Sequence, residues 1–295
     1  MRGVGLFEFG DPDVLQIIDL PEVHAAFGEI RIRVYAASVN PTDLLLRNGS
    51  RAETLRDLSP PYVPGMDAAG VIDEIGPGTD TDLALGTAVM AMVVPFKMHG
   101  AYRESIVLNV DSVVRAPDGF SHPEASTLPM NGLTARQSLD QLALHPGQTI
   151  AVTGAAGIYG GYVVQLAKHE GIKVIADASP ADEALVRGLG ADVIVPRGYD
   201  FSEQVRRVAP DGADGLADGA VLQQLAVGAV RDGGAFASVR GWVGTGERNI
   251  AFHRTSVRDY DHRSDLLGQL RRLAESKIVT LRVAGTYACE QASEA

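Results

Sequence analysis

A glycine-rich segment in the middle of the chain has the composition of a phosphate-binding turn. Residues 152–161 form the sequence VTGAAGIYGG, which follows an apolar run typical of a buried strand and precedes a helical pattern. A turn at that junction presents helix N–H groups to an anion at the positive end of the helix dipole, as pyrophosphate binding requires. The candidate contact residues are Gly154, Ala155, Ala156, Gly157, Ile158, Tyr159 and Gly160.

The turn departs from the usual Gly-x-Gly-x-x-Gly pattern, because Ala155 replaces the first glycine. Alanine is tolerable there if its φ is negative, with Gly154 absorbing the tight bend. Gly157 would let the backbone approach a pyrophosphate, and Gly160 would let the helix pack closely on the sheet. A purely structural turn is the alternative, but the strand, the helix and the βα series that follows favour dinucleotide binding.

The residues beyond the turn leave the choice between NAD and NADP open. Asp177 stands about 20 residues past the turn, where a carboxylate holds a ribose 2′-hydroxyl and repels a 2′-phosphate. Ser179 and Arg197 follow two expected strands and favour the phosphate. Gly241 is expected to line the same cofactor site at another strand end.

The second part of the chain alternates between strands and helices, which predicts a doubly wound parallel α/β sheet. The expected strands are 149–154, 173–178, 192–196, 213–218 and 234–239, with a sixth near 248–252. Helices are expected at 160–171, 181–191, 200–210 and 220–233.

The first 120 residues predict a different, β-rich domain. Apolar and polar residues alternate over 29–39, and further short strands are expected within 68–78, 86–94 and 100–108. The segment 115–126, with two prolines and a glycine, is expected to be the crossing between the domains.

Composition narrows the class of protein. The chain has 295 residues, of which 45% are hydrophobic and 21% charged, and 37 acidic against 26 basic side chains give a formal net charge of −11. This charge disfavours a nucleic-acid partner. Because Cys289 is the single cysteine and no window approaches the ~20 apolar residues of a membrane span, we expect a cytoplasmic protein without disulfides or a membrane segment.

Several segments together resemble the zinc-free quinone oxidoreductase-like branch of the medium-chain dehydrogenase/reductase superfamily. They are VTGAAGIYGGYVVQLAK (152–168), SVNPTD (38–43), PPYVPGMDAAGVIDEIG (60–76), GAYRES (100–105) and LTARQSL (133–139). The resemblance implies a GroES-like β-barrel catalytic domain over 1–122 and 259–295, and a Rossmann NADP-binding domain over 123–258. It also implies a homodimer that uses NADPH, with NADH not excluded, to transfer hydride to a quinone or an α,β-unsaturated carbonyl.

The zinc ligands of related alcohol dehydrogenases are missing. The resemblance aligns Asn40 with a ligand cysteine and Met66 with a ligand histidine, and neither replacement is a plausible zinc ligand. We therefore expect no metal.

Asn40 is the first candidate for polarising the acceptor carbonyl, although Asn40-Pro41 is also a good start for a helix. Tyr62 could donate its hydroxyl to substrate or simply pack in its loop. Thr134, by resemblance, lies near the nicotinamide; a plain helix-start role is the alternative.

Two departures from the family keep alternatives open. The segment 44–59 lacks the tyrosine that some enoyl-reductase relatives use as a proton donor. This absence keeps a non-catalytic NADPH-binding sensor or crystallin-like protein as an alternative. An enoyl-thioester or enone reductase is a second, enzymatic alternative. The resemblance also stops before the family's last helix and strand, so we expect the β-rich domain to lack part of one edge.

Overall fold

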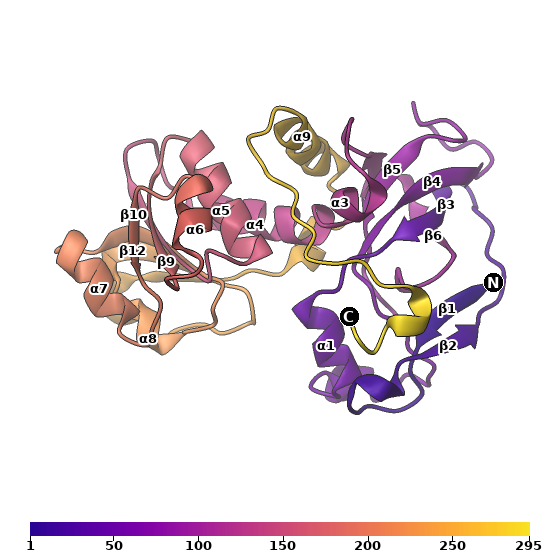
Figure 1. Ribbon diagram of the computed structural model, residues 1–295, viewed down its shortest axis with the longest axis horizontal. Helices are drawn as coiled ribbons and strands as arrows, with labels where there is room; N and C mark the ends of the chain where they lie inside the picture. The colour runs from indigo at the N-terminus through magenta and orange to yellow at the C-terminus, as the bar shows by residue number, and fades with distance from the viewer. The chain divides into compact units, whose positions relative to one another are not determined.

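The computed structural model describes all 295 residues, and the chain folds into two units (Figure 1). The first unit comprises Met1–Met130, Asp261–Glu275 and Leu281–Ala295. The second comprises Asn131–Tyr260 and Ser276–Thr280. Each unit has its own sheet and its own hydrophobic core.

An antiparallel five-stranded sheet in the order β6-β3-β4-β5-β7 forms the centre of the first unit. Its strands are β3 (Glu29–Ala36), β4 (Asp67–Ile75), β5 (Ala88–Met92), β6 (Ser105–Asn109) and β7 (Val113–Arg115). Alternation in β3 buries Ile30 and Ile32 among apolar residues of the other strands. This alternation confirms the strand predicted over 29–39.

The remaining elements of the first unit are short. A separate antiparallel pair joins β1 (Arg2–Gly5) to β2 (Gln16–Asp19). The helices are α1 (Pro41–Arg47), α2 (Ala52–Leu55), α3 (His122–Ser126) and α9 (Ser264–Glu275), and α9 packs on β7. Single 3-10 turns occur at Pro12–Val14, Val110–Ser112 and Cys289–Gln291.

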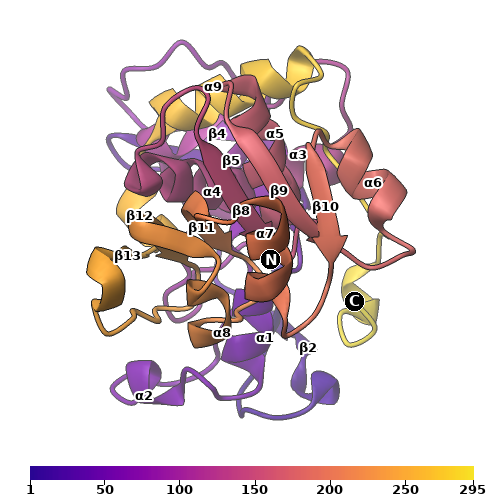
Figure 2. The ribbon, with the colours of Figure 1, turned by 90° about the vertical axis from the view of Figure 1, so that its left-hand side faces the viewer.

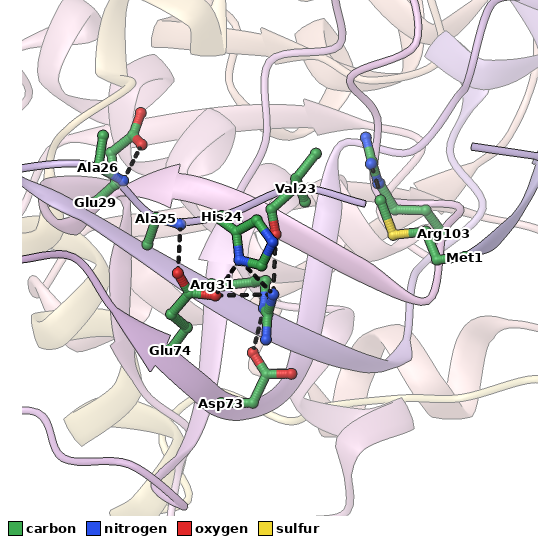
Figure 3. A network of polar contacts seen from close by, with 10 residues as sticks. All are labelled: Met1, Val23, His24, Ala25, Ala26, Glu29, Arg31, Asp73, Glu74 and Arg103. Atoms are coloured by element: carbon green, nitrogen blue, oxygen red, sulfur yellow. Dashed lines mark hydrogen bonds and ion pairs between the residues drawn. The ribbon is translucent and has the colours of Figure 1, made fainter. Parts of the chain in front are cut away.

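Polar contacts join β3, β4 and the loop that precedes β3 (Figure 3). The Arg31 guanidinium of β3 contacts Asp73 and Glu74 of β4, each at 2.8 Å. It also donates to the Val23 carbonyl at 3.0 Å, and Glu74 accepts the backbone N–H of Ala25 at 3.1 Å. The arginine therefore fastens the preceding loop to both strands.

The second unit contains a six-stranded sheet in the order β10-β9-β8-β11-β12-β13, in which every pairing is parallel (Figure 2). Its strands are β8 (Thr149–Thr153), β9 (Lys173–Ala178), β10 (Val193–Pro196), β11 (Ala213–Asp218), β12 (Val230–Ser238) and β13 (Ala251–Arg254). Chain order reverses between β8 and β11, which makes the carboxyl ends of these two strands the topological switch point.

Helices connect the strands of this sheet. They are α5 (Ile158–His169), α6 (Glu183–Gly188), α7 (Phe201–Val208) and α8 (Gln224–Val227), while α4 (Pro129–Leu142) brings the chain into the unit. Further 3-10 turns lie at Glu247–Asn249 and Val257–Tyr260. The doubly wound sheet predicted from the sequence is confirmed. No helix in the structure has the length and apolar character needed to cross a membrane.

The helix predicted over 220–233 is wrong in extent. Only α8 forms there, and β12 already begins at Val230. Val221 and Gln223 have positive φ angles of 58° and 54°, which interrupt a helix. The Asp218 carboxylate holds this bend by accepting two backbone N–H groups, those of Leu222 and Gln223.

The segment 115–126 also has more structure than a simple crossing. It contains the last residue of β7 and all of α3, and it lies within the first unit.

Candidate functional site

The glycine turn leaves β8 at the switch point and opens α5. Gly154 has a φ of +67°, and a Cβ there would lie 3.0 Å from the backbone of Ala220. A Cβ on Gly160 would lie only 2.3 Å from the Gly154 carbonyl oxygen, so no larger residue fits. Gly157 is the N-cap of α5 and has no side chain to cap it. This geometry suits a pyrophosphate at the helix N-terminus.

Ala155 fits the turn because it is not among the residues with positive φ. Its side chain is fully buried, and its backbone N–H donates to the carboxylate of Asp177 at 3.0 Å. Asp177 is 1% exposed. The carboxylate that has the sequence spacing of a ribose ligand therefore holds the glycine turn itself.

Ser179 and Arg197 are brought together at the carboxyl ends of β9 and β10. These strands pair through Ala178 and Pro196, so the next residue of each lies at the same edge. One oxygen of Asp182 accepts from both, at 2.7 Å from the Ser179 hydroxyl and 3.1 Å from the Arg197 guanidinium. The two donors were predicted from the sequence, whereas the Asp182 carboxylate between them was not.

The loop after β11 borders the glycine turn. Asp218 is fully buried and accepts the Thr153 hydroxyl at 2.7 Å, which ties the ends of β11 and β8 together. A Cβ on Gly219 would lie 2.9 Å from the Tyr159 ring. The Tyr159 hydroxyl lies 2.8 Å from the Ser138 hydroxyl, and burial raises the pKa of this tyrosine. Tyr159 is thus a half-buried component of the turn, with its hydroxyl group held against Ser138.

Gly241 follows β12 and has a φ of +75°. A Cβ there would contact the Arg254 side chain at 3.5 Å. The residue therefore has the left-handed backbone conformation that favours glycine at the end of a strand. A direct contact with cofactor stays a prediction.

Asn40 lies in the first unit, where it starts α1 with proline in the first turn. Its side chain and that of Asp43 form a capping box, with the Asn40 N–H donating to Asp43 at 2.9 Å. The Asn40 amide also donates to Asp67 of β4 at 2.7 Å, and Asp67 accepts the Met130 N–H at 2.6 Å. The helix-start role is confirmed.

Two buried carboxyl groups surround this asparagine. Asp43 and Asp67 are 5% and 0% exposed. Burial is the main cause that raises the pKa of Asp43 to about 6 and that of Asp67 to about 7, while the hydrogen bonds they accept act in the opposite direction. The neighbouring Tyr102 hydroxyl contacts Asp43 at 3.5 Å, and burial raises the pKa of that tyrosine.

Tyr62 and Thr134 occupy positions typical of packing residues. Tyr62 is 7% exposed, stacks on Phe9 with 5.6 Å between ring centroids, and donates its hydroxyl to the Leu58 carbonyl at 2.7 Å. Thr134 is 8% exposed, and its carbonyl accepts the Ser138 hydroxyl in α4. Neither observation adds a contact to substrate.

The acidic residues that organise both sites were not among the residues predicted from the sequence. Asp67 could have been recognised from the sequence, because it stands within the otherwise small and apolar segment GMDAAG, where burial of an unpaired charge would be costly. Asp43 could also have been recognised, because it follows Asn40 by three residues, which is the spacing of a capping box. Asp182 follows a strand and Asp218 ends one, and other acidic residues lie near both in the sequence. Neither was therefore recognisable as a site residue from the sequence.

Comparisons with known proteins agree with this architecture. Residues 26–118 match the family model described as an alcohol dehydrogenase GroES-like domain. The chain is 29% identical over 252 residues to a 2-methylene-furan-3-one reductase of Solanum lycopersicum, covering 82% of this chain and 63% of that protein. It is 32% identical over 246 residues to a chloroplastic NADPH-dependent alkenal/one oxidoreductase of Arabidopsis thaliana, covering 80% and 61%. The chain thus spans less than two thirds of the length of either relative.

A solved structure described as an NAD-dependent alcohol dehydrogenase has a TM-score of 0.87 and 28% identity, covering 100% of this chain and 94% of its own. The matching GroES-like segment, the shared sheet topology and these relatives show that the chain belongs to the medium-chain dehydrogenase/reductase superfamily.

Proposed function

We propose that the protein is an NADPH-dependent oxidoreductase that transfers hydride to a quinone or an α,β-unsaturated carbonyl without zinc. The observation that carries this proposal is the glycine turn at the switch point, where Gly154 and Gly160 allow a backbone conformation closed to larger residues. The two relatives described above are named a 2-methylene-furan-3-one reductase and an NADPH-dependent alkenal/one oxidoreductase, which supports the same reaction class.

The second unit would hold the cofactor. The backbone of residues 154–160 would bind the pyrophosphate, with Asp177 fixing the turn from behind through the Ala155 N–H. Ser179 and Arg197 would face the adenosine 2′-phosphate, since a hydroxyl and a guanidinium both donate to phosphate oxygens. When bound, the cofactor supplies the hydride.

Asn40 would orient or polarise the carbonyl of the acceptor. Its amide is held by Asp67, and its backbone is held by Asp43. A donor that is fixed before reaction needs no reorganisation as negative charge develops on the oxygen. Reduction of a quinone requires no side-chain acid, because the oxygen anions can take protons from water.

The chemistry of the donor set supports a reaction without zinc. Asn40 donates hydrogen bonds to the carboxyl groups of Asp67 and Asp43. Met66 is 3% exposed within the apolar core. An amide and a buried thioether do not provide the thiolate and imidazole that zinc prefers. The family resemblance alone supports a homodimer, which sedimentation equilibrium would test.

The experiment is the decay of nicotinamide absorbance with purified protein, using NADPH and NADH separately against a benzoquinone, a naphthoquinone and a short 2-alkenal. Protein-dependent decay above the spontaneous rate is expected with at least one acceptor class. Binding of cofactor without oxidation would favour a sensor, and absence of binding would refute the function assigned to the glycine turn. A preference for the alkenal over both quinones would identify an enone reductase.

A further inference from the structure

We propose that Asp182 limits the preference for NADPH over NADH by competing with the 2′-phosphate of NADPH for Ser179 and Arg197. The inference rests on the proposed function, because it takes the second unit to be the cofactor-binding unit. It concerns only the adenosine end of the cofactor and makes no use of the acceptor site.

The two donors are placed by the register of the sheet. Ala178 pairs with Pro196 at the carboxyl ends of β9 and β10, and Arg197 then donates its backbone N–H to the Ala178 carbonyl at 3.0 Å. Ser179 follows Ala178 directly. Figure 2 shows β10 at the edge of the sheet, with α6 beside it. The pair therefore lies where the ribose of a dinucleotide binds in doubly wound sheets.

The side chain of Asp182 faces these two donors and not the first turn of its own helix, α6. Asp182 is the N-cap residue of α6, a position where aspartate usually accepts N–H groups of the first turn, yet its side chain makes no such bond. Its backbone N–H donates to the Ser179 carbonyl at 3.0 Å. Its Oδ2 atom accepts both the Ser179 hydroxyl and the Arg197 guanidinium.

The Asp182 carboxylate therefore occupies the position between a hydroxyl and a guanidinium that an anionic ligand would take. A 2′-phosphate would have to displace this carboxylate from Arg197 and would suffer its repulsion afterwards. A 2′-hydroxyl could instead donate to it, which is the usual role of an acidic residue near the second strand of an NAD-binding sheet. Asp177, the acidic residue closest to the expected position, is already committed to Ala155.

The expected effect is moderate because the site is open to solvent. The side chains of Arg197 and Asp182 are 46% and 33% exposed. Water screens such pairs, so we expect neutralisation of Asp182 to raise NADPH affinity by about 5- to 20-fold. NADH affinity should stay the same or fall, and the gain should shrink at high ionic strength.

The test is isothermal titration of the full chain with NADPH and with NADH. The variants are Asp182→Asn, which keeps the shape of the side chain, and Asp182→Ala, which removes it. Glu183→Gln is the matched control, because it removes one negative charge from the neighbouring residue, whose carboxylate pairs with Arg187 at 2.7 Å. Thermal unfolding of each variant verifies that the fold is retained.

A rise in the affinity ratio of NADPH to NADH in both Asp182 variants, absent in Glu183→Gln, would support the inference. An unchanged ratio, or an equal rise in Glu183→Gln, would overturn it while leaving the proposed function intact. Failure of the unaltered protein to bind either cofactor would instead refute the proposed function and the inference with it.

A double variant separates competition from a structural effect. If Asp182 acts mainly by occupying Arg197, then Asp182→Asn should give a clearly smaller gain for NADPH in an Arg197→Gln background, where only release of Ser179 and loss of repulsion remain. An undiminished gain in that background would show that the carboxylate acts by another route and would overturn the inference.

Discussion

The side-chain amide of Asn40 donates to the carboxylate of Asp67 at 2.7 Å, and the other oxygen of that carboxylate accepts the backbone N–H of Met130 at 2.6 Å. One buried carboxyl group therefore holds the residue proposed to contact the acceptor and also fixes the start of α4. Because Asp67 lies in β4, the orientation of Asn40 is determined by the sheet and not by its own loop alone.

Replacement of Asn40 by alanine is expected to reduce both activity and stability. Loss of a fixed donor to a developing oxyanion typically lowers kcat/KM by about 100- to 1,000-fold. Loss of the helix cap should lower the free energy of unfolding by roughly 1–2 kcal/mol. Steady-state kinetics with the best acceptor and denaturant unfolding measure the two effects separately.

Ser121→Ala is the matched control for this variant. Ser121 begins α3 with a capping box of its own in the same unit, so its loss should cost about 1 kcal/mol and leave kcat/KM unchanged. If Asn40→Ala lost no more activity than Ser121→Ala, Asn40 would be a helix cap only.

Stability should depend on pH through Asp67. Its pKa is about 7 in the folded protein against 3.8 as the ordinary value, so the folded state binds the proton more tightly. The contribution of Asp67 to stability is therefore fully present below about pH 4 and is lost as pH rises to about 7, at roughly 1.4 kcal/mol per pH unit. Asp43 acts in the same direction with a pKa of about 6.

Asp67→Asn isolates this contribution, because asparagine does not titrate. The free energy of unfolding of the unaltered protein minus that of the variant should fall by roughly 1–4 kcal/mol between about pH 4 and pH 7. Urea unfolding at several pH values measures this difference. A difference that stays constant across the range would show that Asp67 is ionised throughout.

Substitutions in the glycine turn should affect cofactor binding and stability to different extents. Gly157 has a φ of −69°, and a Cβ there would meet only the Gly154 carbonyl oxygen, at 3.2 Å. Gly157→Ala should therefore lower the free energy of unfolding by about 1 kcal/mol. It should weaken the binding of NADPH and of NADH by at least about 10-fold, because the backbone must approach the pyrophosphate. Titration calorimetry and thermal unfolding check both expectations.

Gly160→Ala should instead destabilise the second unit by about 1–3 kcal/mol, because its Cβ would lie 2.3 Å from the backbone of Gly154. Gly268→Ala in α9, where a Cβ would meet only the Arg272 side chain at 3.7 Å, should leave cofactor affinity unchanged. Unweakened cofactor binding by Gly157→Ala would argue for a purely structural turn.

Tyr62→Phe tests whether this tyrosine donates to substrate. Because its hydroxyl donates to the Leu58 carbonyl, we expect a loss of about 1 kcal/mol of stability and a change in kcat/KM below about twofold. A drop in kcat at unchanged stability would assign the hydroxyl to the reaction instead.

The local patterns of the sequence were sufficient for strands β3 to β6 and β8 to β13, for helices α5 to α7 and the start of α1, and for the position of the turn. Alternation placed β3, apolar runs placed β8 and β9, and Asn40-Pro41 marked the start of α1. These features depend on neighbours within a few residues, so the chain itself contains the information. The helix expected over 220–233 failed because Asp218, at the end of β11, binds the backbone that follows it.

The partners of the acidic residues were decided only by the tertiary structure. Asp177 had the spacing of a ribose ligand, but packing of β9 beside β8 directs it to the Ala155 N–H. Asp67 reaches Asn40 across 27 residues of sequence, and Asp182 reaches Arg197 across 15. Spacing along a chain does not determine which side chains meet across neighbouring strands, because sheet order and register set those distances.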